Sequence, residues 1–336
     1  MKKVTKKPFL VDVPVKINIW IRCDCQKKQW EIIKLARPSI LFIQSDGGRN
    51  STEWDAINKN RKMIDESIDW ECQVYKFYED HNNGLYTMDR KVSDFIWSKV
   101  DRCIFTEDDQ LMSLSFFRYC AELLEKYKDD TRIECICGMN HLGICDKVTS
   151  DYFFARQGSI WGYATWRRAR YNENTFDYFD DKYLMKLLKQ RTKNNPIAWK
   201  RLNAYGKDDI YEGHKAGPEF WIEFDMYSQN RLQIIPKYNM ISNIGCSYDS
   251  AHSTEYDDLP KNLKKVFKME LHEMNFPMKH AEYVIPDVYY EKKRNKIMLY
   301  NYSLLRRIIH RFLTFDFGYI FRKIFKKKKH KVSFEK

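Results

Sequence analysis

Apolar and polar positions alternate near the start of the chain and then give way to short apolar runs separated by longer amphipathic stretches. The alternation and the runs predict β-strands at residues 13–21, 39–43, 72–77 and 103–106. Apolar positions at helical spacing predict helices around residues 30–35, 54–68 and 92–97. Strands and helices in strict alternation are typical of parallel strands joined by right-handed crossovers. The chain is therefore expected to form an α/β fold with a mostly parallel central sheet.

The second half of the chain repeats this pattern less regularly. An apolar face over residues 116–127 predicts one more helix. Further short strands are expected at residues 134–138, 232–236 and 240–244. Residues 150–171 are rich in aromatic side chains and glycine, which is typical of a wall that another molecule approaches closely. Residues 172–217 are polar and are expected to be irregular, as either a mobile or an acceptor-facing segment.

Three consecutive acids, Glu107, Asp108 and Asp109, follow the apolar run at 103–106. An apolar-faced segment follows them at once, so we expect the acids at the carboxyl edge of a buried strand, where α/β sheets bind ligands. Adjacent carboxylates repel each other unless a positive group lies between them, and a divalent cation with phosphate oxygens would serve. The alternative is a solvated turn or a helix cap.

The formal net charge of +13 is concentrated at the carboxyl end of the chain. Residues 291–336 hold 15 Lys and Arg against 3 Asp and Glu, so the first 290 residues carry a net charge of only +1. Apolar positions recur at helical spacing in this tail, at Leu305, Ile308, Ile309, Phe312, Phe317, Ile320, Phe321, Ile324 and Phe325. An amphipathic basic tail favours an anionic membrane surface over nucleic acid, because phosphate binding alone would not require apolar stripes. A solvated tail or a nucleic-acid contact are the alternatives.

The nine cysteines do not form paired zinc-binding motifs, and their number is odd, so a reducing cytoplasm is expected. Asp12 and Lys16 interrupt the apolar residues that follow the basic amino terminus, so no signal peptide is expected there. No stretch of 18 uncharged apolar residues is present, which argues against a spanning helix. We therefore expect a cytoplasmic protein that binds the cytoplasmic face of a membrane peripherally through its tail.

Several motifs, in this order along the chain, resemble those of GT-A-fold glycosyltransferases. They are Phe42-Ile43-Gln44-Ser45-Asp46-Gly47, Ile104-Phe105-Thr106-Glu107-Asp108-Asp109, Cys137-Gly138-Met139-Asn140 and Gly158-Ser159-Ile160-Trp161-Gly162-Tyr163-Ala164-Thr165-Trp166. The chain is most similar to bacterial family-2-like sugar transferases and more remotely to the N-acetylglucosaminyltransferase I family. The resemblance implies a Rossmann-like GT-A catalytic domain over 1–255, with a donor-binding half at about 13–140 and an acceptor half at about 141–255. Residues 256–296 would form a helical or irregular extension, and 297–336 a helical basic tail.

The resemblance also implies roles for residues of the donor site. Asp109 matches a ligand of Mn2+ or Mg2+, and Glu107 and Asp108 would lie near the ribose and the cation. Asp46 matches the aspartate that recognises the nucleotide base, and Arg22 is placed to meet phosphate or ribose. Two of these positions have simpler interpretations, because aspartate before glycine is frequent in turns and an arginine at a strand end is often solvated.

Glu219, in Gly217-Pro218-Glu219-Phe220-Trp221, lies where the family has the acid that takes a proton from the acceptor hydroxyl. One carboxylate opposite the leaving group is sufficient for inversion at a sugar carbon. The family more often has aspartate after tryptophan at this point. Asp208, Asp209 and Glu223 therefore remain alternatives.

The remaining implied site residues are His252, as a contact to the diphosphate or metal, and Asn140, Trp161, Gly162 and Trp166, in the donor or acceptor pocket. A single histidine in a polar loop is equally consistent with a surface position, and Trp166 with core packing.

The resemblance as a whole implies a metal-dependent, inverting glycosyltransferase, a hexosyl- or N-acetylhexosaminyltransferase, that moves a sugar from a nucleotide donor, UDP-linked by preference, to a glycan or lipid-linked hydroxyl. Polysaccharide biosynthesis would be its setting. A sugar-phosphate nucleotidyltransferase is an alternative, but it would need a glycine-rich loop after the first strand, and Arg22-Cys23-Asp24-Cys25-Gln26 has no glycine. A non-enzymatic basic adaptor for membrane or nucleic acid is another.

Overall fold

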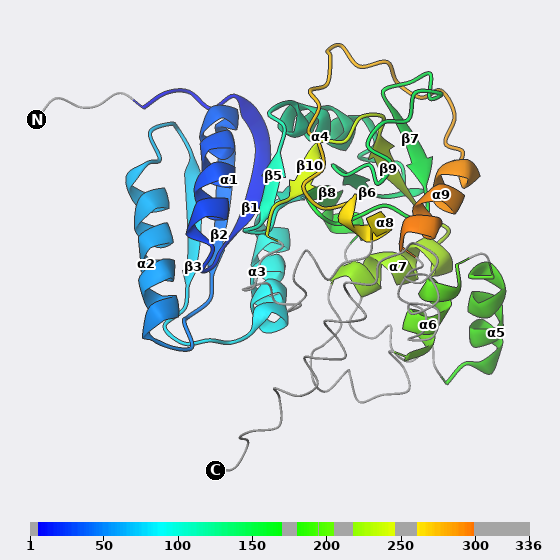
Figure 1. Ribbon diagram of the computed structural model, residues 1–336, viewed down its shortest axis with the longest axis horizontal. Coiled ribbons are helices and arrows are strands. Elements are labelled where there is room, and N and C mark those ends of the chain that lie inside the picture. Colours follow the sequence, from blue (N-terminus) through cyan, green and yellow to red (C-terminus); the bar gives the residue numbers. More distant parts are fainter. Residues whose placement is uncertain (1–5, 170–179, 194, 205–217, 246–260, 299–336) are drawn as a thin grey trace, which may run out of the picture.

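The computed structural model describes residues 6–169, 180–193, 195–204, 218–245 and 261–298, and these form an α/β fold (Figure 1). The large sheet contains, in spatial order, β3 (Gln73–Tyr78), β2 (Pro38–Ser45), β1 (Val11–Ile19), β4 (Arg102–Phe105), β8 (Tyr163–Trp166), β6 (Ile133–Cys137), β9 (Leu232–Pro236) and β7 (Tyr152–Ala155). A small antiparallel sheet contains β5 (Gln110–Met112) and β10 (Ile241–Asn243). The helices are α1 (Cys23–Ala36), α2 (Ser51–Glu66), α3 (Leu85–Lys99), α4 (Ser115–Lys126), α5 (Lys182–Arg191), α6 (Pro196–Ala204), α7 (Pro218–Ser228), α8 (Lys261–Lys264) and α9 (Val288–Met298), with a short 3-10 turn, η1 (Arg167–Ala169).

The central sheet is mostly parallel, as the sequence predicted. Strands β3, β2, β1 and β4 are parallel neighbours, and β6 and β9 run in the same direction. Within the described residues, only β8, between β4 and β6, and β7, at the edge, run the opposite way. The four strands predicted first match β1 to β4 within two residues at each end. This arrangement is consistent with a Rossmann-like GT-A fold.

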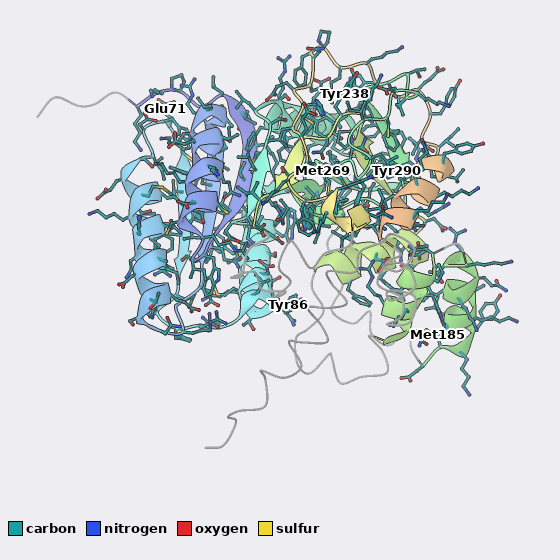
Figure 2. The ribbon with its side chains drawn as sticks, viewed as in Figure 1. Glu71, Tyr86, Met185, Tyr238, Met269 and Tyr290 are labelled. Atoms are coloured by element: carbon teal, nitrogen blue, oxygen red, sulfur yellow. The ribbon has the colours of Figure 1, made fainter. Side chains whose placement is uncertain are left out.

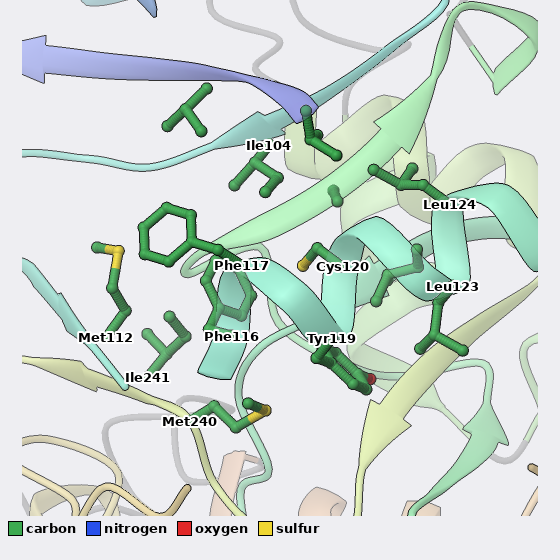
Figure 3. Packing of buried hydrophobic residues seen from close by; sticks show 14 of the residues in the cluster. Ile104, Met112, Phe116, Phe117, Tyr119, Cys120, Leu123, Leu124, Met240 and Ile241 are labelled. Carbon is green, nitrogen blue, oxygen red and sulfur yellow. The ribbon is translucent and has the colours of Figure 1, made fainter. Parts of the chain in front are cut away.

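Two apolar layers cover the two faces of the sheet. Along β1, Val15 and Ile17 point to the layer formed with α1 and α4, whereas Lys16 and Asn18 point to the α3 face. Figure 3 shows the first layer, in which side chains of α4 pack against Ile104, Met112, Met240 and Ile241. The apolar face predicted for α4 is buried at Phe116, Phe117, Cys120, Leu123 and Leu124. Burial of these rings and aliphatic groups is the main term that fixes the helices on the sheet.

The expectation that residues 172–217 are irregular was wrong for their described part, which contains α5 and α6. The Asp181 carboxylate caps α5 by accepting the backbone N–H groups of Tyr183 and Leu184, both at 2.9 Å. Leu188 of α5 and Leu202 of α6 are buried in a third apolar cluster against Phe220 of α7. Because most other side chains of α5 and α6 face solvent, the apolar periodicity in the sequence is too sparse to reveal these helices.

The described residues after 260 pack on the same body as the earlier strands. Val266, Met274 and Met278 are buried in the first apolar layer. Pro286 forms an isolated bridge with Phe154 of β7, and the Tyr290 ring meets the Phe153 ring at a centroid distance of 4.9 Å. The proposed division at residue 255 stays a prediction. The basic tail lies outside the described residues, except for Ile297 and Met298 at the end of α9.

None of the helices in the described ranges has the length and apolarity that crossing a bilayer would require.

An arginine shared by one buried and one partly buried carboxylate joins β6 to the end of α7. Arg231 Nη1 lies 2.7 Å from Glu134 Oε2 and 3.3 Å from Asp225 Oδ2. Burial raises the pKa of Glu134 to about 8, and Asp225 adds to this, while Arg231 opposes it. Burial also raises the pKa of Asp225 to about 6. One guanidinium group does not offset the desolvation of two carboxylates.

These raised values predict the sign of a pH effect on stability. The folded state binds the proton on Glu134 more tightly than the unfolded state does, so this contribution is full below the unfolded pKa and is lost as the pH rises through the folded value near 8. We expect the free energy of unfolding to fall between about pH 5 and about pH 8, with a slope of at most about 1.4 kcal/mol per pH unit for one proton. Urea unfolding at constant ionic strength measures it. Glu134→Gln should flatten the slope and Glu66→Gln, at an exposed position on α2, should not; equal slopes in both variants would contradict the assignment.

Candidate functional site

The predicted acids lie at the carboxyl edge of the sheet, in the turn between β4 and β5. Because β1 and β4 are parallel neighbours, their ends bring Arg22 and the acids together. Arg22 Nη1 donates to Asp109 Oδ2 at 2.7 Å and approaches Asp108 Oδ1 at 3.5 Å. All three side chains are mostly buried. The sequence predicted the acids at this edge, and the structure also brings Arg22 into contact with them.

The same cluster contains buried polar atoms that lack a partner among the described residues. They are Asp108 Oδ2, Asp109 Oδ1 and Arg22 Nε. A buried carboxylate oxygen without a hydrogen bond costs roughly 1–3 kcal/mol or more. Such atoms are rare in folded proteins, so they mark the cluster as a candidate binding site. The two free oxygens belong to the carboxylates that Arg22 already contacts, so the cluster has acceptor capacity left for a cation.

The charge balance of the cluster also favours a cation. Burial raises the pKa of Glu107 to about 8, and the nearby Asp109, Asp89 and Asp108 raise it further, against the opposing effect of Lys16. Burial raises the pKa of Asp108 to about 7, where Arg22 opposes the shift and Asp109 adds to it. Lys16 and Arg22 therefore do not balance the negative charge of the buried carboxylates. A cation bound between them would lower the free energy of their charged forms.

Buried amide side chains from α1 hold the acidic turn. Gln29 Nε2 donates to the carbonyl oxygens of Glu107 and Gln110, the latter at 3.1 Å, and Gln26 Nε2 donates to Gln29 Oε1 at 3.0 Å. The Gln110 side chain accepts the Glu107 N–H at 3.1 Å. Sequence reasoning missed these residues. The available signal was that Gln26 and Gln29 share a helix face with the buried Trp30 and Ile33, where apolar side chains are expected.

We expect Gln29→Leu to loosen the acidic turn. Two buried carbonyl groups would lose their donor, which should lower the free energy of unfolding by about 2–4 kcal/mol. If the turn positions donor-binding groups, kcat/KM should also fall by about 10-fold to 100-fold. Urea unfolding and donor turnover measure the two effects. Gln190→Leu, at an exposed position on α5, is the matched control and should change neither; a Gln29→Leu variant that behaves like it would contradict this role.

The chain returns to the acids after β10. Ile244 N donates to the Asp109 carbonyl oxygen at 2.8 Å. A Cβ atom on Gly245 would lie 2.2 Å from Asp109 Cβ and 2.7 Å from Arg22 Nη1, so only glycine fits at this approach. His252, which the resemblance brought back towards the metal, lies outside the described residues. The segment that carries it begins directly after the glycine that contacts Asp109.

Asp46 lies at the end of β2, next to β1, and its carboxylate organises a neighbouring loop. It accepts backbone N–H groups from Gly47 at 3.0 Å, Asn83 at 2.9 Å and Gly84 at 2.8 Å. These bonds hold the residues that lead into α3. The predicted role in base recognition stays a prediction, and the observed contacts agree with the alternative that Asp46 is a turn residue.

The predicted pocket residues divide into two groups. Trp161 and Gly162 lie at the end of β8 that pairs with Phe105, next to the acids, and the Trp161 ring meets Phe267 at 5.0 Å. Trp166 pairs with Arg102 at the opposite end of the sheet, and its Nε1 donates to the Leu124 carbonyl at 3.0 Å. Its position favours the core-packing alternative.

Asn140 is fully buried, and its side chain is used within the fold. Its Nδ2 donates to the carbonyls of Pro236 and Lys237, both at 3.0 Å, and its Oδ1 accepts the Leu142 N–H at 3.0 Å. These contacts join the chain after β6 to the chain after β9. They favour a structural role over direct contact with a sugar.

Glu219 is in the first turn of α7, but its side chain lies outside the described residues, as do the alternatives Asp208 and Asp209. The remaining alternative, Glu223, is buried and paired with Arg201, with Oε2 at 2.7 Å from Nε and Oε1 at 3.0 Å from Nη2. Both carboxylate oxygens of Glu223 are therefore engaged by the guanidinium group of Arg201. The structure therefore leaves Glu219 as the acid to test first.

The fit of Mn2+ or Mg2+ can be judged from the donor set. Across the described ranges, no group of three or more His, Cys, Asp and Glu side chains is arranged to hold a metal. The free oxygens of Asp108 and Asp109 nevertheless suit a hard cation, which is commonly bound by one or two carboxylates together with water and substrate phosphates. The residues present thus fit a hard divalent cation whose remaining ligands are supplied from outside the protein.

Comparisons with known proteins give weak likenesses. No protein-family model matches the chain, and no curated protein matches it. A solved mannosyltransferase from Pyrobaculum calidifontis, in complex with GDP-Man and Mn2+, shares 10% identity over 48% of this chain and 47% of its own, with a TM-score of 0.32. A mannose-1-phosphate geranyltransferase from Thermus thermophilus shares 11% identity over 70% of this chain and 77% of its own, with a TM-score of 0.33. The chain thus spans about half the length of the first. Function has to be inferred from the site itself.

Proposed function

We propose that this protein is a metal-dependent, inverting glycosyltransferase that moves a sugar from a nucleotide donor, UDP-linked by preference, to a hydroxyl of a glycan or lipid-linked acceptor. The observation that carries the proposal is the contact of Arg22 with Asp108 and Asp109 at the carboxyl edge of a parallel sheet, with one unpaired oxygen left on each acid. Carboxylate oxygens without a hydrogen bond can bind a cation, and the arginine beside them can bind the phosphates that accompany the cation.

Each residue of the cluster has a distinct task in this proposal. Asp109 and Asp108 would hold Mn2+ or Mg2+, which neutralises charge on the departing diphosphate when bound. Arg22 holds the carboxylates together in the free protein and can donate its free Nε–H to phosphate. Gln29 keeps the turn in place. Gly245 lies against Asp109 and leaves no room for a side chain at this point of the site.

Transfer with inversion needs a base on the acceptor side, and Glu219 is assigned that task. Its carboxylate would accept the proton of the acceptor hydroxyl as that oxygen attacks the anomeric carbon and the nucleoside diphosphate leaves. The family resemblance supports a hexosyl or N-acetylhexosaminyl group as the sugar that we propose is transferred.

The connection between β1 and α1 bears on the nucleotidyltransferase alternative. It consists of residues 20–22, Trp-Ile-Arg, and contains no glycine. A glycine-rich loop lets successive backbone N–H groups approach a triphosphate closely. This connection offers instead a guanidinium group already paired with carboxylates. The observation favours the glycosyltransferase.

A thermal-shift screen of nucleotide sugars with and without Mn2+ tests the proposed function. At least one nucleotide sugar should raise the melting temperature only when the metal is present, because ligand binding stabilises the folded state by mass action. The same compound should then be hydrolysed slowly without acceptor. Stabilisation by a nucleoside triphosphate with a sugar phosphate, and by no nucleotide sugar, would support the nucleotidyltransferase instead.

We also propose that the basic tail, residues 297–336, binds the cytoplasmic face of an anionic membrane, where a lipid-linked acceptor is available, and that nucleic acid is not a partner. Deleting residues 299–336 should reduce flotation with phosphatidylserine vesicles by at least about 10-fold, since each basic group near such a surface contributes about 1 kcal/mol. Donor hydrolysis in solution should persist. Loss of hydrolysis with unchanged circular dichroism would favour a tail that belongs to the active site, and unchanged flotation would contradict the membrane role.

A further inference from the structure

Four large apolar or aromatic side chains are exposed close together just before and at the start of α9. Tyr283 is 67% exposed, Ile285 68%, Val288 46% and Tyr289 76%. Scattered exposed apolar residues are ordinary on a protein surface, but a concentration within seven consecutive residues is not. None of the four contributes to the apolar layers that hold the fold together.

These side chains are held outward by a well-anchored backbone. Asp287 N donates to the Phe154 carbonyl at 2.7 Å, and the Asp287 carboxylate accepts the N–H groups of Tyr289 and Tyr290, both at 2.9 Å. Tyr290, labelled in Figure 2, is buried, and its hydroxyl lies 3.1 Å from His141 Nδ1. One tyrosine of the pair therefore fixes α9 to the body, and the other faces solvent as a consequence.

Basic side chains follow on the next turns of α9. Lys292, Lys293 and Lys296 are exposed, and Lys292 Nζ lies 6.0 Å from the centroid of the Tyr289 ring. The two acids next to these lysines form hydrogen bonds within the fold. Glu291 Oε1 accepts the Arg156 N–H at 2.7 Å, and Asp287 caps the start of α9. The side that faces solvent thus combines aromatic and aliphatic groups with ammonium groups.

We propose that this surface, formed by Tyr283, Ile285, Val288, Tyr289, Lys292, Lys293 and Lys296 and here called the α9 surface, binds an anionic lipid membrane. Tyrosine places an apolar ring and a polar hydroxyl at the boundary between acyl chains and headgroups, and lysine pairs with anionic headgroups. A protein partner would be expected to meet fewer lysines, which are depleted in protein interfaces.

The chain itself supports a membrane as the occupant. The α9 surface ends where residues 299–336 begin, and that stretch carries the second concentration of apolar and basic residues in the sequence. The inference therefore rests on the proposed membrane location and extends it. A tail alone would tether the enzyme, whereas a contact on the folded body also sets its orientation. Arg294 of α9 donates to the Gly158 carbonyl at 3.2 Å, so α9 is bonded directly to the proposed acceptor half. A membrane bound to the α9 surface would therefore set the orientation of that half.

The test uses the full chain and two variants that remove different parts of the surface. Ile285→Ser with Tyr289→Ser removes apolar groups, and Lys292→Glu with Lys293→Glu reverses charge. Each should weaken partitioning into phosphatidylserine-containing vesicles by at least about 5-fold. Donor hydrolysis in solution and circular dichroism should not change, because no residue of the α9 surface belongs to the donor site. Leu35→Ser with Tyr183→Ser, at exposed positions on α1 and α5, is the matched control and should bind vesicles like the parent.

The other outcomes are distinguishable. Parental vesicle binding by both variants would overturn the inference while leaving the tail as the membrane contact. If the parent chain itself fails to bind anionic vesicles, the membrane location fails and this inference fails with it, whereas nucleotide-sugar hydrolysis would still stand. If light scattering shows that the parent is an oligomer and the variants are monomers, the α9 surface is an interface between copies, and the membrane assignment is wrong.

Discussion

Replacing Asp109 with asparagine is expected to abolish metal-dependent binding of the nucleotide sugar and to lower kcat/KM by at least about 100-fold, the scale on which loss of one electrostatic contact to the transition state acts. Asparagine keeps an oxygen that can accept from Arg22 Nη1, now at 2.7 Å from Asp109 Oδ2, but removes the charge that a cation needs. Asp109→Ala is less suitable, because the buried guanidinium group of Arg22 would keep only its longer contact to Asp108. A loss of donor binding could then not be separated from a loss of stability. Calorimetric titration of the donor with and without Mn2+ measures the effect.

Asp55→Asn, at an exposed position on α2, is the control for a lost surface charge and should bind donor like the parent protein. Circular dichroism and urea unfolding should show that Asp109→Asn is folded. Donor affinity that is unchanged in the variant and still responds to Mn2+ would remove Asp109 from the metal site. In that case the free oxygens of the cluster would have to be explained by water.

The sequence predicted those elements of the fold that depend mainly on interactions between residues close together in the chain. Strands β1, β2 and β4 are largely buried on both faces, so each gives a clear apolar signal, and α3 and α4 carry stripes of buried apolar residues. Strands β7 and β8 lie in the aromatic and glycine-rich stretch at 150–171, where composition did not separate strand from loop, and their antiparallel direction depends on the neighbours they pair with. Helices α5 and α6 bury few residues, so their polar composition suggested irregular chain.

The candidate site shows the same limit. The position of the acids at the carboxyl edge followed from a simple rule, since α/β sheets bind ligands where their strands end. Their contact with Arg22 was not predicted, because it depends on β1 and β4 being neighbours. The support of the acidic turn by Gln29 could not be read in advance, because it depends on how α1 packs across β5. Likewise, only the folded structure shows that the Asn140 amide donates to the carbonyls of Pro236 and Lys237. The sequence does not distinguish an amide side chain that contacts a ligand from one that bonds to buried backbone.

Glu219→Gln is expected to leave donor binding intact and to reduce transfer to the acceptor by about 10²-fold to 10⁴-fold, the usual contribution of a general base. Glutamine has the shape of the acid but cannot take up the proton that the acceptor hydroxyl must release. Hydrolysis of the donor by water should fall less than transfer, because Asp109 and Arg22, which serve the leaving group, are untouched. Single-turnover transfer measured beside calorimetric donor affinity separates the two effects.

Parallel variants at the alternatives decide the assignment. Asp208→Asn and Asp209→Asn should retain transfer if Glu219 is the base. Glu223→Gln should act mainly on stability, because Glu223 is buried and its two oxygens are paired with Arg201. Such a loss appears as a lower urea midpoint with little change in kcat, whereas loss of a base appears in kcat with an unchanged midpoint. Normal transfer by Glu219→Gln, with a kcat defect in one of the other three, would move the base to that residue and leave the donor site as described.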